Sequence, residues 1–419
     1  MRYNSLSLLA LIFAVSFGFV TTPTAAFATQ EQVLYSFCTL PRCADGQYPY
    51  AGLLTDKAGN MYGTTGSGGV YNAGVVYELS PTSSGWQETV LHSFGGKLDG
   101  YGPWSGTLVM DESGDLYGTT IAGGTFNAGT AFELMHKPTS SVWTEKILHN
   151  FDGNGVDGSN VNGGLVRDAQ GNLYGTTYSG GPLSGCNGLG CGTVFELSPS
   201  PNGVWTEKIL FAFNQDGFQG ANPADSLTFD QAGNLYGTTE SGGPGGSQFG
   251  LGVVFELARN GNNGWAEQVL YNFGSVRYDG NNPLTNVIFD AAGNLYGTTG
   301  NGAYTTGSVF ELTPQSSGQW TFTQLCSFCY SPSALAFDTA GNLYTAIPLG
   351  GPDNDGFVLE LVRPTAGGKW QQVVLYNFDM TDGSGPTGSP IVESRSNTLY
   401  GVTTYGGTNL GGTVYELTP

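Results

Sequence analysis

The sequence predicts an all-β protein, a seven-bladed β-propeller made of four-stranded blades, and three observations support this prediction. One phrase, seen clearly as Asp-Ala-Gln-Gly-Asn-Leu-Tyr-Gly-Thr-Thr at 168–177, is written seven times with small edits. Each repeat consists of short runs rich in β-branched and aromatic residues, separated by Gly, Pro, Asn and Asp. The last repeat lacks a strand, and the start of the chain supplies one. A long internal period of this kind indicates an array, a solenoid or a propeller.

Residues 1–28 have the pattern of an export signal. Arg2 provides a positive start, 6–20 is an apolar run, and Ala26-Phe27-Ala28 is a small-x-small cleavage site. A retained membrane anchor is the alternative, but the apolar run is short for a span. We therefore expect a secreted or periplasmic domain of residues 29–419 with no transmembrane segment after cleavage and no anchoring through its own tail.

Each repeat is interpreted as four strands, a to d. In the copy that begins at Gly106, we expect strand a at 107–110, strand b at 116–120, strand c at 130–134 and strand d at 143–151. The a–b turn has the form Asp-x-x-Gly, and the b–c loop contains Gly-Gly. The copies are marked by the strand-b tyrosines Tyr62, Tyr117, Tyr174, Tyr236, Tyr296, Tyr344 and Tyr400.

The number of strands indicates how the ring closes. Strand c ends in Glu-Leu seven times, at Glu78, Glu133, Glu196, Glu256, Glu311, Glu360 and Glu416, but only six copies are followed by a strand d. The seventh strand d lies at 31–37, before the first full repeat. We expect 31–37 to pair with 386–418, because this closes the ring and removes unpaired edges. An open β-solenoid is the alternative, but it has no reason to exchange a strand between its ends.

The repeated polar residues and glycines have structural roles in this interpretation. We assign the acidic residue of each a–b turn to turn formation rather than catalysis: Asp56, Asp111, Asp168, Asp230, Asp290, Asp338 and Glu393. We expect the strand-b glycines to let neighbouring sheets approach closely, with Thr345 as the exception in the sixth repeat. The strand-c glutamates are expected to bond to the Thr-Thr pair or to a backbone amide, rather than to form a functional ring.

Composition and cysteine spacing restrict the possible partners. With 33 acidic and 13 basic residues, the chain has a formal charge of −20, which disfavours nucleic acid and anionic lipid. Aromatic residues make up 13 %, so the 68 glycines indicate turns rather than disorder. Three close pairs, Cys38/Cys43, Cys186/Cys191 and Cys326/Cys329, predict three local disulfides. A metal site at Cys326 and Cys329 is the alternative, but no second Cys-x-x-Cys completes it.

The combination of Gly-Asn-Leu-Tyr-Gly-Thr-Thr, Gly-Gly and Gly-x-Val-Phe-Glu-Leu resembles the GloVer tandem-repeat proteins of bacteria, also described as choice-of-anchor repeat proteins. The resemblance covers about 31–419. It implies an exported protein and no established activity, so it assigns no functional residues. The Asp-x-x-Gly-Asn-Leu-Tyr phrase is also similar to strands of NHL-type and lactonase-like propellers, which supports the fold and not a function.

Binding is expected on the face formed by the d–a and b–c loops, because variable loops on a rigid scaffold carry function. Carboxylates and flat aromatic rings together suit a polysaccharide, and Trp104 is the strongest candidate because the other tryptophans lie in strand d. Calcium bound by loop oxygens is a second hypothesis, and turn chemistry is the third. The candidate ligand-binding residues are Trp104, Tyr101, Asp99, Asp45, Asp157, Asp216, Asp279 and Asp382.

The sequence favours a non-enzymatic binding module, which we expect to be a monomer. We identify no Gly-x-Ser-x-Gly elbow, no cluster of metal ligands and no catalytic residue, and His92 and His149 lie in strand d, away from the channel. A protein-interaction platform of the cell envelope is one alternative. A propeller glycosidase, lyase or lactonase is the other, and the irregular stretch 326–347 would then be the place to look.

Overall fold

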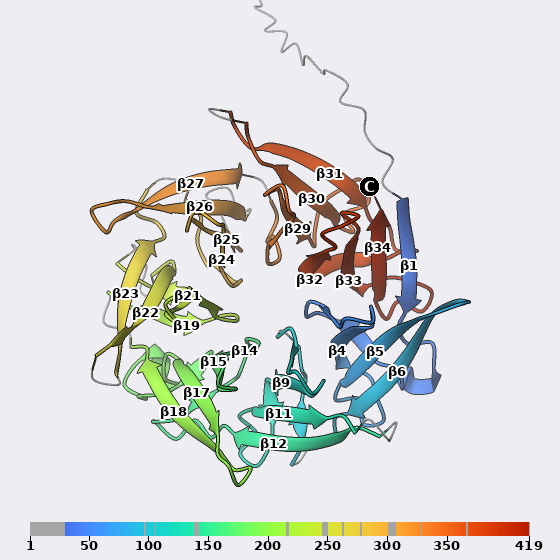
Figure 1. Ribbon diagram of the computed structural model, residues 1–419, viewed down its shortest axis with the longest axis horizontal. Coiled ribbons are helices and arrows are strands. Elements are labelled where there is room, and N and C mark those ends of the chain that lie inside the picture. Colours follow the sequence, from blue (N-terminus) through green and yellow to red (C-terminus); the bar gives the residue numbers. More distant parts are fainter. Residues whose placement is uncertain are drawn as a thin grey trace, which may run out of the picture.

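The computed structural model describes residues 30–418 except 96–97, 105, 138–141, 215–217, 245–249, 262–263, 277–278, 301–306, 328 and 366–367. The predicted signal 1–28 and the candidate residue Asp216 lie outside the described residues. Within them the protein is a ring of antiparallel blades around a central channel, and this confirms the seven-bladed propeller (Figure 1). The described helices are the short 3-10 segments η1 (Pro41–Cys43) and η2 (Cys186–Gly188), and none is long and apolar enough to cross a membrane.

In each of the first four blades, a short additional strand before strand a pairs with strand b or with the segment that follows strand b. Blade 1 contains β2 (Gln47–Pro49), β3 (Leu54–Thr55), β4 (Met61–Ser67), β5 (Val75–Thr82) and β6 (Gly85–Ser93). Blade 2 contains β7 (Gly100–Tyr101), β8 (Val109–Met110), β9 (Leu116–Thr120), β10 (Ala122–Gly123), β11 (Thr130–Met135) and β12 (Thr144–Asn150). Blade 3 contains β13 (Gly158–Ser159), β14 (Val166–Arg167), β15 (Leu173–Thr177), β16 (Ser179–Gly180), β17 (Thr193–Pro199) and β18 (Trp205–Ala212). Blade 4 contains β19 (Gly220–Pro223), β20 (Thr228–Phe229), β21 (Leu235–Gly242), β22 (Val253–Asn260) and β23 (Gly264–Asn272).

The remaining three blades are plain four-stranded sheets. Blade 5 contains β24 (Ile288–Phe289), β25 (Leu295–Thr299), β26 (Ser308–Pro314) and β27 (Trp320–Ser327). Blade 6 contains β28 (Ala336–Phe337), β29 (Leu343–Ile347), β30 (Phe357–Val362) and β31 (Gln371–Asn377). Blade 7 contains β32 (Ser384–Val392), β33 (Leu399–Tyr405), β34 (Thr413–Thr418) and β1 (Gln30–Ser36).

The N-terminal strand closes the ring, as the strand count predicts. β1 pairs antiparallel with β34, with Gln30 opposite Thr418 and Ser36 opposite Thr413, and the blade runs β1-β34-β33-β32. Figure 1 shows β1 lying beside the last strands of the chain. Blade 7 therefore has an outer strand like the other blades, and this strand comes from the N-terminal part of the chain.

Strand a is shorter than expected, because the residues before it bond to the neighbouring blade. β8 begins at Val109 instead of residue 107. In blades 1 to 5 the first threonine of the strand-b Thr-Thr pair reaches across the junction. Thr64 donates to the carbonyl of Pro103 at 2.7 Å, and Thr119 donates to that of Gly163 at 2.8 Å. These bonds tie the channel wall of one blade to the next.

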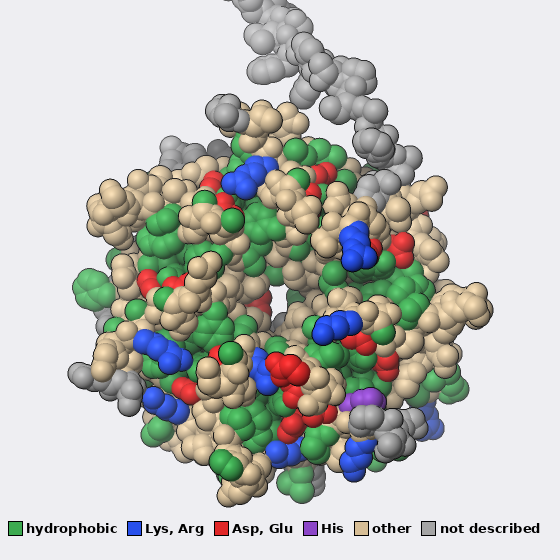
Figure 2. Space-filling view, viewed as in Figure 1, with side chains coloured by type: hydrophobic (Ala, Val, Ile, Leu, Met, Phe, Trp, Pro, Cys, Tyr) green, Lys and Arg blue, Asp and Glu red, His purple; other side chains and the backbone are tan. Residues whose placement is uncertain are grey.

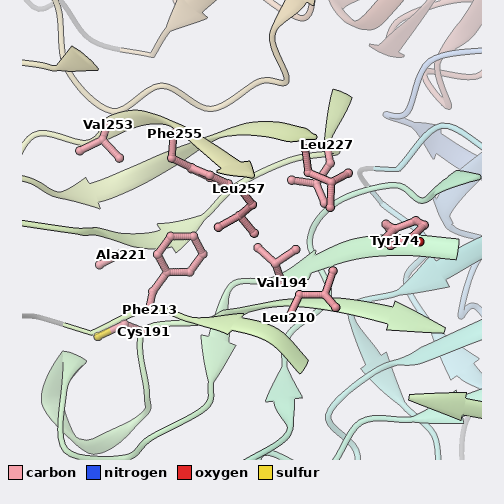
Figure 3. Close-up of a cluster of buried hydrophobic side chains, with 11 residues drawn as sticks. Tyr174, Cys191, Val194, Leu210, Phe213, Ala221, Leu227, Val253, Phe255 and Leu257 are labelled. Atoms are coloured by element: carbon pink, nitrogen blue, oxygen red, sulfur yellow. The ribbon is translucent and has the colours of Figure 1, made fainter. Parts of the chain in front are cut away.

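The hydrophobic core is divided among the junctions between blades. Among the described residues, seven clusters of buried side chains each contain residues from two successive blades. Figure 3 shows the cluster between blades 3 and 4, where Phe213 of one blade meets Phe255 of the next with ring centroids 5.2 Å apart. Burying this apolar surface requires the neighbouring blade, so each junction stabilises the two blades it joins.

The strand-b glycines make room within their own blade, and the expectation of close contact between sheets was wrong. Gly118 lies opposite Phe132 of strand c, and a Cβ at Gly118 would be 2.6 Å from Cζ of that ring. The same relation holds for Gly237 and Phe255. In blade 6 Thr345 replaces the glycine, and its partner is the smaller Leu359. Glycine is therefore needed in strand b because the aromatic ring of the paired strand-c residue lies over it.

The acidic residue of the a–b turn has the structural role that the sequence predicts. Oδ1 of Asp168 accepts bonds from the backbone nitrogens of Gln170 and Asn172, both at 2.9 Å, and Oδ2 accepts one from the Tyr174 hydroxyl at 3.0 Å. The prediction that the strand-c glutamate bonds to the Thr-Thr pair or to a backbone amide was wrong. In the cross-strand register glutamate faces the strand-b tyrosine, and the Tyr117 hydroxyl lies 3.0 Å from Oε1 of Glu133.

The three cysteine pairs form disulfides. Cys38 is bonded to Cys43, Cys186 to Cys191 and Cys326 to Cys329. The pairing confirms the prediction and removes the alternative of a metal site at Cys326 and Cys329.

Candidate functional site

A cavity of about 640 Å³ lies where the d–a and b–c loops meet around the channel. Residues from all seven blades line it, and Figure 2 shows an opening at the centre of the ring. Its volume is within the range of small-ligand sites. Most of the lining consists of small, hydroxyl and amide side chains, such as Thr107, Ser226, Thr285, Asn286 and Ser389.

Two aromatic side chains border this cavity, and one of them is held firmly. Trp104 is 45 % exposed and Tyr50 is 46 % exposed. The indole Nε1 of Trp104 donates to the carbonyl of Gly66 at 3.1 Å. A Cβ at Gly66 would lie 3.1 Å from Cε2 of the indole, so glycine is what allows the ring to rest on blade 1. The indole is therefore positioned before any ligand arrives.

Two carboxylates from blade 4 complete the cavity. Asp225 accepts bonds from the backbone nitrogens of Ser226 at 2.6 Å and Asn286 at 3.1 Å. Burial raises the pKa of Asp225 to about 6, although these bonds oppose the shift. Glu240 accepts a bond from the Tyr178 hydroxyl at 2.6 Å. The carbonyls of Gly163 in blade 3, Asp225 in blade 4 and Thr285 in blade 5 each accept a bond from the strand-b threonine of the preceding blade, so these residues correspond. The acid at 225 therefore breaks the symmetry of the channel.

The structure places the aromatic residues and the carboxylates of the predicted ligand-binding site in different parts of the molecule. Trp104 lines the cavity, and Tyr101 lies nearby in sequence on β7 and is 42 % exposed. The Asp-Gly carboxylates that the structure describes lie instead between blades: Asp45, Asp157 and Asp279 are 0 %, 7 % and 2 % exposed, and Asp99 and Asp382 are partly exposed. Asp45 accepts bonds from the Tyr35 hydroxyl at 2.9 Å and from the backbone nitrogen of Thr39 at 2.8 Å. These carboxylates are occupied by contacts within the protein.

A β-bulge in strand d explains how these junctions form. In every blade the register between strands c and d shifts by one residue, which in blade 1 leaves Leu91 without a partner between Val90 and His92. The extra residue changes the direction in which the later side chains of the strand point. Val90 faces the cluster shared with blade 7, whereas Leu91 and Phe94 face blade 2. Glu88, before the bulge, therefore points to one neighbour and His92, after it, to the other.

Each polar junction combines three contributions. At the junctions of blades 7 and 1, 1 and 2, 2 and 3, and 6 and 7, strand d of one blade gives a Tyr or His, the loop after it gives the Asp of Asp-Gly, and strand d of the next blade gives a Glu. Burial and the nearby Asp45 raise the pKa of Glu88 to about 8. Burial, Asp382 and Asp379 raise the pKa of Glu31 to about 7. These glutamates hold a proton near neutral pH, because a second negative charge beside a buried aspartate is unfavourable.

At two successive junctions the strand-d residue that contacts the Asp of Asp-Gly is a histidine. His92 Nε2 lies 3.3 Å from Oδ2 of Asp99 and 3.8 Å from Oε2 of Glu145. His149 Nε2 lies 3.1 Å from Oδ2 of Asp157 and 3.6 Å from Oε2 of Glu207. Sequence reasoning missed these clusters because the members of each come from two repeats. The recurring third position of strand d, together with the Asp-Gly loop, is the signal that could have indicated them.

A second cavity, of about 570 Å³, lies between blades 3 and 4 at the end of the a–b and c–d turns. Arg259 borders it, and its guanidinium lies 4.9 Å from the ring centroid of Trp265 and 3.4 Å from the Tyr174 hydroxyl. Lys and Arg side chains are spread around the face of the ring seen in Figure 2. Arg259 therefore contributes to the packing between two blades.

Comparison with known sequences identifies one family. The profile of a family described as Gloeobacter/Verrucomicrobia repeat matches residues 18–247 and 185–332, which together make up most of the chain. No curated protein matches the sequence.

Solved structures with a similar fold are distant in sequence. Virginiamycin B lyase from Staphylococcus aureus has a TM-score of 0.55 at 12 % identity, with 93 % of this chain and 99 % of that chain covered. The same lyase in an inactive form with quinupristin gives 0.55 at 13 % identity, with the same coverage. The extracellular domain of a protein described as a hybrid two-component system, from B. thetaiotaomicron, gives 0.53 at 11 % identity and covers 94 % of this chain and 41 % of that one. At these identities the likeness concerns the fold alone.

Proposed function

The chain belongs to the Gloeobacter/Verrucomicrobia repeat family, and on that premise we propose that it is an exported, non-enzymatic module that binds extracellular polysaccharide at the mouth of its channel. The observation that carries the proposal is the fixed, half-exposed indole of Trp104 beside a cavity that is lined by apolar side chains together with hydroxyl, amide and carboxylate groups. Three disulfides support export, because such bonds persist in oxidising compartments.

The chemistry of the cavity suits a neutral sugar chain. The apolar face of a pyranose can lie on an indole, and its hydroxyls need acceptors such as Asp225 and Glu240. Because Trp104 is already held by Gly66, binding loses little side-chain freedom. Tyr50 offers a second ring on the same rim. The buried Asp-Gly carboxylates have no part in this proposal.

Co-sedimentation with a panel of insoluble polysaccharides tests the proposal, with residues 29–419 as the protein and with calcium or chelator present. We expect saturable binding without released sugars, and binding that is weakened at least roughly tenfold, or ~1.4 kcal/mol, by Trp104→Ala. Phe126→Ala is the matched control, since Phe126 is an exposed aromatic of a b–c loop that does not line the cavity. Equal binding by wild type and Trp104→Ala would contradict the proposal.

An acid–base enzyme is the second candidate, and Asp225 favours it. A carboxyl whose pKa is raised to about 6 by burial in a cavity is suited to proton transfer. Soluble sugars released in the same assay, and lost in Asp225→Asn, would establish this activity. Binding to none of the polysaccharides would favour the envelope protein-interaction platform.

A further inference from the structure

The two histidine junctions have the composition and spacing of a metal site. Each offers one imidazole nitrogen and two carboxylate oxygens that lie within 4.8 Å of one another. Nitrogen and oxygen ligands at about 2.0–2.1 Å from a tetrahedral Zn²⁺ are themselves about 3.3 Å apart. The measured separations from the imidazole nitrogen are 3.3 and 3.8 Å at His92, and 3.1 and 3.6 Å at His149.

We propose that His92, Asp99 and Glu145 form one Zn²⁺ site and that His149, Asp157 and Glu207 form a second. Three protein ligands leave a fourth position for water. A mixed nitrogen and oxygen set favours Zn²⁺ over Ca²⁺ and Mg²⁺, which take oxygen ligands.

A second observation comes from the glutamates themselves. Oε1 of Glu145 and Oε1 of Glu207 are buried and lack a hydrogen-bond partner among the described residues. Oε1 of Glu88 and Oε1 of Glu31 lack one as well, so the imidazole is what distinguishes the histidine junctions from the tyrosine junctions. An unpartnered buried carboxylate oxygen is unfavourable. A divalent cation beside each carboxylate would compensate for both the missing partner and the repulsion between Asp and Glu.

The junctions with tyrosine show what the histidine adds. At the first junction the Tyr35 hydroxyl donates to Asp45 at 2.9 Å, and Glu88 is the nearby acid. The last junction has Tyr376, Asp382 and Glu31 in the same roles. A neutral phenol satisfies the aspartate by hydrogen bonding but does not replace imidazole as a zinc ligand. The hydrogen-bonded aspartate therefore occurs with tyrosine as well as with histidine, and among the described residues the candidate metal sites are confined to blades 1 to 3.

The ligands of each site come from successive blades. His92 lies on β6 of blade 1, Asp99 lies in the loop after β6, and Glu145 lies on β12 of blade 2. His149 lies on β12, and Glu207 lies on β18 of blade 3. Zn²⁺ at both sites would join three consecutive blades, and would stabilise the folded protein because the unfolded chain does not hold the ligands together.

Zinc binding by the purified protein tests this inference. Protein freed of metal by chelator is equilibrated with micromolar Zn²⁺, separated by gel filtration and analysed for zinc, and its thermal unfolding is compared in Zn²⁺ and Mg²⁺. We expect two Zn²⁺ per chain, and we expect Zn²⁺ but not Mg²⁺ to raise the Tm. The variant His92→Tyr should bind one Zn²⁺, and the double variant His92→Tyr, His149→Tyr should bind none. In Mg²⁺ both variants should have the Tm of the wild type, because tyrosine restores the hydrogen bond to aspartate.

Glu88→Gln is the matched control and should still bind two Zn²⁺, because it removes the glutamate of a tyrosine junction. Replacement of Zn²⁺ by Co²⁺ should give the visible absorption of a four-coordinate site in wild type and not in the double variant. Absence of zinc in the wild type, or the same zinc content in the double variant, would overturn the inference. So would an equal loss of zinc in Glu88→Gln, which would indicate unspecific binding to acidic side chains.

Discussion

The junctions between blades and the mouth of the channel use polar residues in different ways. At four of the junctions the same residue types recur, and their carboxylates are bonded within the protein, as Asp45 is to Tyr35 and Thr39. At the mouth, Trp104, Asp225 and Glu240 are not repeated in the other blades and border an open cavity. In a repeat protein, a recurring carboxylate therefore indicates architecture, whereas a departure from the repeat indicates a place for function.

Removal of the closing strand should have the largest effect on this architecture. Without residues 29–37, blade 7 loses β1 and the edge of β34 becomes unpaired. The apolar cluster between blades 7 and 1 loses the buried side chains of Leu34 and Phe37 as well. We expect a sharp fall in Tm in a calorimetric scan, relative to a protein that lacks only 1–28. An unchanged melting curve would show that β1 does not close the ring.

A smaller loss is expected from filling the space under an aromatic ring. Gly118→Ala places a Cβ 2.6 Å from Cζ of Phe132, and overpacking of this kind costs about 1–3 kcal/mol. The double variant Gly118→Ala, Phe132→Leu should recover part of the loss, because blade 6 pairs a larger residue, Thr345, with Leu359. Denaturant unfolding measures both.

Gly261→Ala is the control for this experiment, since a Cβ there meets no atom within 4 Å. If Gly118→Ala is as stable as Gly261→Ala, the ring over strand b does not require the glycine.

The junction glutamates should make the protein less stable as the pH rises from about 4.5 to 8. The pKa of Glu88 is raised from 4.5 to about 8 by burial and Asp45, and that of Glu31 to about 7 by burial and Asp382. Between pH 4.5 and 8 the folded protein therefore holds protons that the unfolded chain has released, so the free energy of unfolding falls as pH rises. We expect this fall to be measurable by urea unfolding at a series of pH values across that range, with chelator present.

Glu88→Gln should reduce that pH dependence, because an amide does not ionise. Glu112→Gln is the control: the pKa of the exposed Glu112 is lowered, chiefly by a backbone hydrogen bond and by Arg167, so it does not titrate in this range. Equal slopes for the two variants would contradict the assignment of the raised pKa to Glu88.

The smallest effect on stability is expected at the mouth. Trp104→Ala removes a side chain that is 45 % exposed, and we expect a change in the free energy of unfolding below ~1 kcal/mol together with the loss of polysaccharide binding. Chemical denaturation of the same preparation used for binding measures this. A large loss of stability would show that the indole belongs to the architecture, and the distinction between the two regions would no longer hold at this residue.

The sequence was sufficient for the ring and its closure, because strands can be counted and short β runs recognised. It was not sufficient for the polar junctions. Simple alternation places His92 on the same face as Val90, and only the bulge at Leu91 turns it toward Asp99 and Glu145. A bulge changes the register without changing the pattern of residue types. The pairing of Glu133 with Tyr117 was missed for a similar reason, since it depends on which residues lie opposite each other.

The candidate site was predictable in part. Trp104 stood out because it is a tryptophan in a loop, and the structure places it on the cavity. Its contact with Gly66 joins two blades, and no spacing in the sequence indicates it. Asp225 and Glu240 lie one on each side of the Asp-x-x-Gly phrase of blade 4, and only the curvature of the ring brings them to the same cavity.

The pairing of Gln30 with Thr418 has a consequence for the order of events during synthesis. The ribosome releases β1 first, but its partner β34 emerges after every other blade. During elongation β1 is therefore an unpaired, partly apolar strand. The ring closes only when β1 and β34 pair. Contacts so distant along the chain form slowly. An elongation arrest near the end would leave an open ring with two unpaired strand edges.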